Sequence, residues 1–220
     1  MPPPPVVLDV DGTLVDSNFQ HALTWHRAFA RHGRAIPAWR THRAIGMGGD
    51  QLVPALAGEE WAAEHGDAVA ETEAALFGEL IGSVAPLPGA RAFLETLKER
   101  GHAVVLGSSA KQSDLDVFLD VLDARRLVDA WTVSDDVEQT KPEPDIVHAA
   151  LAKLGNPGDG VMVGDSVYDI QAAHAAGLPA IGLLTGGFGA QELRDVGAEY
   201  VYEDLLELLA KLDESPLRRR

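Results

Sequence analysis

Four aspartates in two short segments of the sequence could do chemistry together. Asp9 and Asp11 lie in DVDGTLVDS, and Asp165 and Asp169 lie in VMVGDSVYD. Carboxylates that fold into one place repel one another unless a cation lies among them, and oxygen ligands of this kind suit Mg²⁺. If the fold brings the two segments together, we therefore expect a magnesium site there.

Two further segments could act on an anion held at that site. Ser108 and Ser109 lie in VVLGSSAK, and Lys141 lies in TKPEPD. Lys141 would add a fixed positive charge, while a serine hydroxyl and the backbone N–H groups beside it could hold phosphate oxygens. Gly12 permits a tight turn, so that the backbone can approach the ligand. These residue types predict a phosphate-binding site.

The spacing of Asp9 and Asp11 indicates how a phosphate group could react. In a regular strand the two side chains would face the same way, but a turn that begins after Asp9 could move Asp11 toward the leaving group. One carboxylate could then attack while the other gives and takes a proton.

Short apolar runs precede these polar segments and explain how they could meet. The runs predict buried strands at 6–10, 103–106, 130–133, 161–163 and 180–184. Helix-like stretches lie between them, at 90–100, 114–122, 145–154 and 168–176. This alternation predicts an α/β fold, a three-layer doubly wound parallel sheet with helices on both faces. Ligands of such sheets bind beyond the carboxyl ends of the strands, where all four segments are expected.

Residues 16–84 interrupt the alternation, because they contain no convincing strand. Helical patterns are expected at 17–32, 51–56 and 59–81. The first would place Phe19, Leu23 and His26 on one face, with Trp25 and Phe29 beside it. We therefore expect two domains, which are an α/β core formed by 1–15 and 85–220 and an inserted helical domain at 16–84.

The composition limits the classes of partner and of chemistry. The formal net charge is −16, and so acidic a surface disfavours nucleic acid and anionic membranes as partners. The absence of cysteine excludes disulfides, thiol nucleophiles and thiolate metal sites. The first residues, MPPPPVV, do not resemble a signal peptide, and no apolar run approaches the roughly 18 residues of a membrane helix. We expect a cytoplasmic protein, a monomer or homodimer, with a frayed end at 218–220.

In their order along the chain, DVDGTLVDS, Ser108, KPEPD around Lys141 and GDSVYD resemble the four motifs of the haloacid dehalogenase-like superfamily. The resemblance extends from Val6 to about Gly189, and the helical insertion resembles the small cap domain of that superfamily. The ordered set is much more specific than any single motif. It implies a magnesium-dependent phosphatase that acts on a small phosphorylated metabolite.

The resemblance also implies a role for each matching residue. Asp9 would be the nucleophile that forms an aspartyl-phosphate, and Asp11 would be the general acid and base. The side chains of Asp9 and Asp165 and the main-chain carbonyl of Asp11 would bind Mg²⁺, with Asp169 supporting that site. The phosphoryl group would be oriented and stabilised by Thr13, Ser108 and Lys141.

Further predictions concern residues around the expected site. Gly12 and Ser109 are candidates for binding the phosphate, and His21 is a hinge or substrate-contact candidate. The segment IGMGGDQL at 45–52 resembles the cap loop that faces the active site in relatives, and its Gly48 would allow close approach to the substrate. The glycine-rich stretch at 185–190 lacks the spacing and the lysine of a nucleotide loop, so we expect a connection into a helix.

Two enzyme classes remain open, a phosphatase and a sugar phosphomutase similar to β-phosphoglucomutase. His21 and Trp25, in QHALTW, resemble the start of the mutase cap. The mutases carry an arginine in the cap loop where this chain has Gly49, and they often have Glu-Asp where Gly164-Asp165 stands here. Both differences favour the phosphatase. By family analogy alone, phosphoglycolate or a small sugar phosphate would be the nearest substrate.

Overall fold

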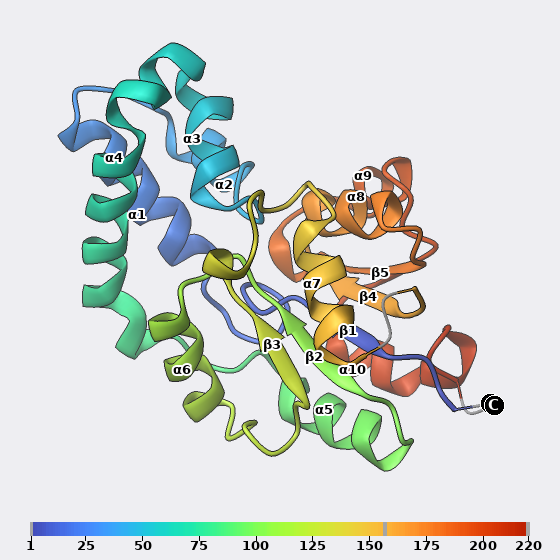
Figure 1. Cartoon of the computed structure of the whole chain (residues 1–220). Coiled ribbons are helices and arrows are strands. Elements are labelled where there is room, and N and C mark those ends of the chain that lie inside the picture. Colours follow the sequence, from blue (N-terminus) through green and yellow to red (C-terminus); the bar gives the residue numbers. More distant parts are fainter. Residues whose placement is uncertain (1, 156–157, 219–220) are drawn as a thin grey trace.

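The computed structural model describes residues 2–155 and 158–218, and within them the strands form one parallel sheet (Figure 1). The strands are β1 Val6–Leu8, β2 Val104–Gly107, β3 Ala130–Thr132, β4 Val161–Gly164, β5 Ala180–Leu183 and β6 Tyr200–Tyr202. They stand in the order β3-β2-β1-β4-β5-β6. The first five match the expected apolar runs within a residue or two, whereas the sequence did not predict β6.

Helices cover both faces of the sheet, which gives three layers. One face carries α5 Ala90–Glu99, α6 Gln112–Val121 and α10 Leu205–Ala210. The other face carries α7 Asp145–Lys153, α8 Val167–Ala175 and α9 Ala190–Asp195. Val6 and Leu8 of β1 pack in the first layer and Val7 packs in the second, because successive strand residues point to opposite faces. The predicted α/β class with a doubly wound sheet is confirmed.

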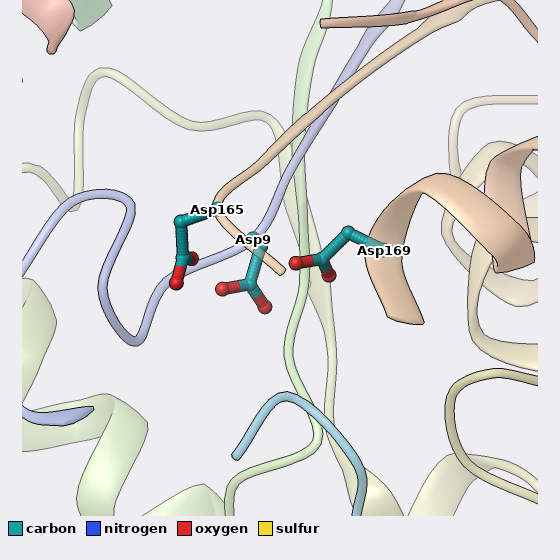
Figure 2. A group of neighbouring side chains, drawn as sticks. All are labelled: Asp9, Asp165 and Asp169. Atoms are coloured by element: carbon teal, nitrogen blue, oxygen red, sulfur yellow. The ribbon is translucent and has the colours of Figure 1, made fainter. Parts of the chain in front are cut away.

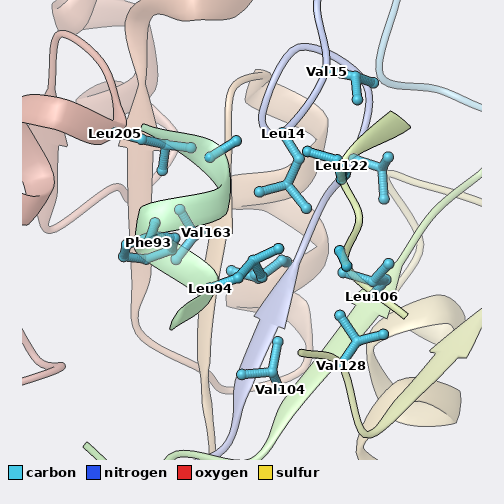
Figure 3. Packing of buried hydrophobic residues seen from close by; sticks show 14 of the residues in the cluster. Leu14, Val15, Phe93, Leu94, Val104, Leu106, Leu122, Val128, Val163 and Leu205 are labelled. Atoms are coloured by element: carbon cyan, nitrogen blue, oxygen red, sulfur yellow. The ribbon is translucent and has the colours of Figure 1, made fainter. Parts of the chain in front are cut away.

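The larger apolar core lies between the sheet and α5, α6 and α10 (Figure 3). Phe93 and Leu94 of α5 are fully buried in the same cluster as Val104 and Leu106 of β2 and Val163 of β4. Burial stabilises side chains of this size by about 1.5–3 kcal/mol each relative to exposure. This packing fixes the strands whose ends carry the polar segments.

The strand order reverses beside β1. On one side of β1 lie β2 and β3, and on the other lie β4, β5 and β6. β1 pairs directly with both β2 and β4, with Leu8 opposite Leu106 and Val163. The residues that follow these three strands therefore lie together beyond the carboxyl ends of the strands. This is the switch point where α/β sheets bind their ligands.

Within the described residues, the four α-helices between β1 and α5 form a body beside the sheet (Figure 1). They are α1 Asn18–Arg31, α2 Ala38–His42, α3 Gly49–Ala57 and α4 Glu59–Leu80. Helices α1, α3 and α4 share an apolar core of their own, to which Trp25 and Phe29 belong. The sequence did not predict α2. Phe19 and Leu23 are exposed, because the buried stripe of α1 runs through Trp25 and Phe29.

The two segments that lead into and out of this insertion run side by side. Asp16 N donates to Ala85 O at 2.9 Å, and Leu87 N donates to Leu14 O at 2.9 Å. The insertion therefore joins the core at one place, directly after the residues that follow β1.

The longest helix described, α4, has 22 residues and carries acidic residues along its length. Across residues 2–155 and 158–218, no helix is long and apolar enough to cross a membrane. Of the end expected to fray, Arg218 is exposed, and residues 219 and 220 lie outside the described residues.

Candidate active site

Three buried carboxylates converge beyond the ends of β1 and β4 (Figure 2). Asp9 directly follows β1, Asp165 directly follows β4, and Asp169 lies in the first turn of α8. One oxygen from each lies within 4.8 Å of the other two. The strand pairing produces this arrangement, because Asp9 N donates to Val163 O at 3.0 Å.

The start of α8 holds Asp169 in place. Ser166 donates to Asp169 Oδ2 through its N–H at 3.0 Å and through its hydroxyl at 2.7 Å. Asp169 N donates in return to Ser166 Oγ at 3.2 Å, so the pair forms a capping box. A carboxylate in the first turn also suits the positive end of the helix dipole.

Lys141 is a buried cation between two of these carboxylates. Its Nζ lies 2.7 Å from Asp169 Oδ1 and also contacts Asp9 Oδ1. Burial by itself would lower the pKa of Lys141, but the charges of Asp169 and Asp9 outweigh it and raise that pKa. The ammonium group is therefore charged at neutral pH, and it compensates only part of the charge of three carboxylates.

The uncompensated charge is visible in the pKa values of Asp9 and Asp165. Burial raises the pKa of Asp9 well above its usual value, Lys141 offsets part of this rise, and Asp169 and Asp165 add to it. Burial and the charge of Asp169 raise the pKa of Asp165 to about 7. Buried carboxylate oxygens that lack positive charge fit a hard divalent cation such as Mg²⁺. The donor set thus agrees with the predicted magnesium site.

The turn after β1 orients Asp165. Thr13 Oγ1 donates to Asp165 Oδ1 at 2.7 Å, and Asn18 Nδ2 donates to Asp165 Oδ2 at 2.8 Å. Gly12 has a φ of +76°, and a Cβ there would lie 2.2 Å from Asn18 Nδ2 and 2.4 Å from Asp165 Oδ2. The close approach expected at Gly12 is therefore made to these two side chains. The predicted contacts of Gly12 and Thr13 with a phosphoryl group stay predictions.

Asp11 faces the helical insertion. Ser17 Oγ donates to Asp11 Oδ1 at 2.5 Å, and His21 Nε2 lies 3.4 Å from the same oxygen. Burial would raise the pKa of Asp11, but His21 and the Ser17 hydroxyl bring it below its usual value. Asp9 and Asp11 thus have different surroundings, as a division between nucleophile and proton carrier requires. The predicted metal contact of the Asp11 carbonyl stays a prediction.

His21 contacts a carboxylate that the sequence did not single out. Its Nδ1 lies 3.0 Å from Glu73 Oε1, and its ring stacks on Phe77 with centroids 3.8 Å apart. Burial would lower the pKa of His21, but Asp11 and Glu73 raise it to about 10. Glu73 was missed because many exposed glutamates surround it on α4. The one signal is its position four residues after Val69 and before Phe77, in an otherwise apolar stripe.

The two serines after β2 have different surroundings. Ser108 is fully buried, and its Oγ accepts a hydrogen bond from Ala110 N at 3.0 Å. Ser109 lines a cavity, and its buried Oγ has no hydrogen-bond partner among the residues that the structure describes. An unpartnered buried hydroxyl needs an acceptor, which an anion would supply. The predicted phosphate contacts of both serines stay predictions.

The cavity has a volume of about 160 Å³ and opens beside Asp9 and Asp11. Core and insertion both contribute to its walls, through Trp25, Met47, Gly48, Glu73, Ser109, Lys111 and Asp114. A reacting group at Asp9 would therefore have its remaining atoms enclosed by the inserted helices.

The predicted loop at 45–52 lies against the segment that carries Lys141. Gly48 lines the cavity, and its N–H donates to Thr140 Oγ1 at 3.0 Å. Thr140 N donates to Asp50 Oδ2 at 3.0 Å, and the hydroxyl of Thr140 donates to the other oxygen of Asp50. The insertion is thus tied to the residue directly before Lys141. The role of Gly48 in contacting substrate stays a prediction.

Comparison with protein families decides where the chain belongs. The model of the haloacid dehalogenase-like hydrolases matches residues 6–177. The chain belongs to this family. The matched range includes all four segments that carry Asp9, Ser108, Lys141 and Asp165, and the predicted family and hydrolase class are confirmed.

Relatives of this hydrolase align along most of its length. It is 31% identical to a phosphoglycolate phosphatase of Pseudomonas putida over 217 residues, which cover 93% of this chain and 78% of the relative. It is 29% identical to a phosphoglycolate phosphatase of Haemophilus influenzae over 216 residues, or 93% of this chain and 96% of the relative.

Solved structures share its fold. A hydrolase from Pseudomonas syringae has a TM-score of 0.90 and 34% identity, covering 96% of this chain and 98% of the other. A proposed β-phosphoglucomutase from Bacteroides vulgatus has a TM-score of 0.88 at 22% identity, covering 99% and 91%. The second likeness shows the fold alone. Both likenesses span nearly the whole chain, so they include the inserted helices as well as the sheet.

Proposed function

We propose that the protein is a magnesium-dependent phosphatase that hydrolyses a small phosphomonoester through an aspartyl-phosphate on Asp9. The position of Asp9 carries this proposal. Asp9 belongs to the buried carboxylate group, contacts Lys141 and lines the cavity. A nucleophile in this place meets a cation site on one side and a substrate chamber on the other. Relatives named as phosphatases support the same activity.

Asp9, Asp165 and Asp169 would hold Mg²⁺, with the main-chain carbonyl of Asp11 as a further oxygen ligand. The three carboxylates suit this task because they are buried, close together and incompletely compensated by Lys141. When bound, the ion would neutralise negative charge between Asp9 and a phosphate group.

In the first step, an oxygen of Asp9 attacks the phosphorus, and the bond between the phosphorus and the ester oxygen breaks. Lys141 lies beside Asp9, where its charge would stabilise a phosphoryl oxygen. The departing oxygen takes a proton from Asp11. The negative charge of an arriving phosphate would raise the pKa of Asp11, as the role of acid requires.

In the second step, a water molecule attacks the phosphorus, gives a proton to Asp11, and the bond to Asp9 breaks. Inorganic phosphate leaves, and the carboxylate of Asp9 is restored. Ser17 and His21 favour the anionic form of Asp11, which is the form that accepts this proton.

The cavity supports a small substrate with a second anionic group. Its volume of about 160 Å³ leaves little room beyond a phosphate and a few further atoms. Lys111 on the wall offers a positive charge for a carboxylate, whereas Glu73 and Asp114 disfavour a substrate with many negative charges. Phosphoglycolate carries one phosphate and one carboxylate, and it is the named substrate of the relatives. We therefore propose it as the first substrate to test.

A sugar phosphomutase is the second candidate, and the cavity wall disfavours it. The mutases carry an arginine where Gly49 stands here. A Cβ at Gly49 would lie 3.3 Å from the indole of Trp25, so a large side chain there would have to displace Trp25. The likeness to a proposed mutase is structural, at 22% identity.

We further propose that residues 16–84 act as a cap domain over the core formed by 1–15 and 85–220. The insertion supplies Trp25, Met47 and Glu73 to the cavity. A chamber closed in this way excludes bulk water from the first step. A cytoplasmic location and a monomeric or homodimeric state belong to the same proposal.

Phosphate release from a panel of small esters tests the proposed function. The panel contains phosphoglycolate, hexose and pentose phosphates and mononucleotides, each with Mg²⁺ and with a chelator. We expect release that needs Mg²⁺ and that disappears in Asp9→Asn. Release that persists in Asp9→Asn would contradict the assignment of the nucleophile. If no ester is hydrolysed but β-glucose 1-phosphate is isomerised, the mutase is the correct class.

A further inference from the structure

Glu73 is a buried carboxylate that the steps above do not use. It lies on α4 in a stripe whose other members, Val69, Leu76 and Phe77, are apolar and buried. A carboxylate in such surroundings is unfavourable unless its oxygens are bound. Glu73 Oε1 accepts a hydrogen bond from Thr24 Oγ1 at 2.7 Å and lies 3.0 Å from His21 Nδ1. One oxygen of Glu73 therefore contacts two side chains of α1.

His21 connects Glu73 to Asp11. While its Nδ1 faces Glu73, its Nε2 lies 3.4 Å from Asp11 Oδ1. The ring lies on Phe77 with an angle of 15° between the ring planes. Because Nδ1 is bound by Glu73 and one face is covered by Phe77, rotation of the ring is restricted. In the orientation that remains, the ring presents Nε2 to Asp11.

The contact reaches one particular oxygen of Asp11. Ser17 and His21 both meet Oδ1. Two neighbours at one oxygen fix the plane of the carboxylate group, and the plane determines where Oδ2 can give or take a proton. Proton transfer is sensitive to such placement, since a displacement of about 1 Å can cost about 100-fold in rate.

We infer that Glu73 is a positioning residue that acts through His21 to orient Asp11 for proton transfer to the leaving group. This inference rests on the proposed phosphatase function. Glu73 and His21 belong to the insertion, and Asp11 belongs to the core. The insertion therefore contributes to the chemistry as well as enclosing the substrate.

The leaving group of the substrate provides the test. The kcat/KM of an enzyme that forms a phosphoenzyme reports the steps up to release of the alcohol. The alcohol of phosphoglycolate leaves with a proton from Asp11, whereas the phenolate of p-nitrophenyl phosphate leaves without one. The ratio of the two kcat/KM values therefore isolates the proton transfer. If another ester proves best in the panel, it replaces phosphoglycolate in the ratio.

Leucine completes the apolar stripe of α4, so Glu73→Leu removes the carboxylate without opening a cavity. We expect Glu73→Leu and His21→Leu each to lower the ratio, alkyl over p-nitrophenyl, by about tenfold. The double variant should lower it no further, because both changes interrupt one path. Glu73→Gln keeps an acceptor for the His21 N–H and should stay within about threefold of the unsubstituted protein. Glu71→Leu, an exposed glutamate two positions earlier on α4, should leave the ratio unchanged.

Several outcomes would overturn the inference. An unchanged ratio in Glu73→Leu, or losses that multiply in the double variant, would show that Glu73 acts on the substrate directly or only on the fold. A Glu73→Gln variant as defective as Glu73→Leu would exclude positioning through the hydrogen bond. Absence of turnover by the unsubstituted protein with every ester is a different result, because it contradicts the proposed function and the inference together.

The imidazole N–H of His21 gives a measurement that needs no turnover. In the unsubstituted protein, NMR should show a signal for the Nδ1–H of His21, the N–H that faces Glu73, and this proton should exchange slowly with water. We expect this signal to persist in Glu73→Gln and in Glu71→Leu and to vanish in Glu73→Leu. A signal that survives in Glu73→Leu would overturn the inference even if that variant had lost activity.

Discussion

The Nζ atom of Lys141 lies 2.7 Å from Oδ1 of Asp169, and both side chains are buried. The same ammonium group contacts Asp9, so a lysine from the loop beyond β3 links the end of β1 to the first turn of α8. An unpaired charge is costly in each of these places. The contact therefore stabilises the fold as well as the candidate site.

Replacing Lys141 with Met should lower the free energy of unfolding by about 3 kcal/mol at neutral pH, because two buried carboxylates lose their counter-charge. Urea unfolding measures this change. Lys153→Met breaks an ion pair with Asp136 in which the lysine is 39% exposed. Lys153→Met should lower the free energy of unfolding by less than about 1 kcal/mol. Equal losses in the two variants would contradict the role of Lys141.

In a chelator, the stability of the protein should fall as the pH rises from about 4 to about 7. The pKa of Asp165 is raised to about 7 in the folded chain, so the folded state binds more protons than the unfolded state across this window. The Asp165 carboxyl therefore favours folding at low pH, and ionisation at high pH costs on the order of 4 kcal/mol.

The raised pKa of His21 acts in the same direction between about 6.5 and 10, where its favourable contribution is lost. Urea unfolding at several pH values checks the sign. In Asp165→Asn, the free energy of unfolding should decrease less as the pH rises from about 4 to about 7. In Asp120→Asn, this decrease should be unchanged. The pKa of the exposed Asp120 lies below its usual value, which is the wrong direction for a stability that falls as the pH rises. A fall that is equally steep in Asp165→Asn would contradict the assignment.

Mg²⁺ should raise the melting temperature. At a concentration about 100 times the dissociation constant, binding to the folded state adds about 2.7 kcal/mol. In a chain of this size that corresponds to about 5–10 °C. Asp165→Asn should lose the increase, because Asp165 belongs to the carboxylate group. Asp11→Asn should keep it, since the Asp11 side chain lies outside that group and its carbonyl is retained. An increase of the same size in Asp165→Asn would place the ion elsewhere.

Gly12→Ala should destabilise the protein by about 3 kcal/mol, through crowding added to backbone strain. Gly33 is a matched control, because its φ of +75° equals that of Gly12 within a degree and its Cβ would meet nothing within 4 Å. Gly33→Ala should therefore cost about 1 kcal/mol, the strain alone. Gly12→Ala should also reduce the increase in melting temperature that Mg²⁺ causes, since the new Cβ displaces Asp165. Similar losses in the two variants, measured by urea unfolding, would rule out crowding as the cause.

The fold could be predicted where an element is long or fully buried. β1, β2 and β4 are continuous apolar runs, so composition alone indicates them. β6, at Tyr200–Tyr202, is a partly exposed edge strand of three residues, and α2, at Ala38–His42, has five residues. Neither is long enough to show a period. The exposure of Phe19, which stacks on His42, could not be predicted for another reason. Hydrophobicity alone does not tell which of two adjacent stripes of a helix packs against a neighbour.

The candidate site could be predicted where the chemistry lies in a short motif. Asp9 and Asp165 stand at strand ends in recognisable segments. Asn18 and Glu73 could not be predicted, because their partners lie 147 and 52 positions away along the chain. Their importance follows from contacts made in the folded chain, and the one local signal is the position of Glu73 in an otherwise apolar stripe.

The junction between insertion and core has a consequence for how such enzymes diversify. Leu14 pairs with Leu87, and Asp16 pairs with Ala85. The core therefore meets the same two adjacent segments, whatever sequence lies between them. An insertion of another length could replace this one at the junction, while the proposed nucleophile and the proposed cation site in the core stay unchanged. The incoming insertion would then need residues of its own for the positioning role that we propose for His21 and Glu73.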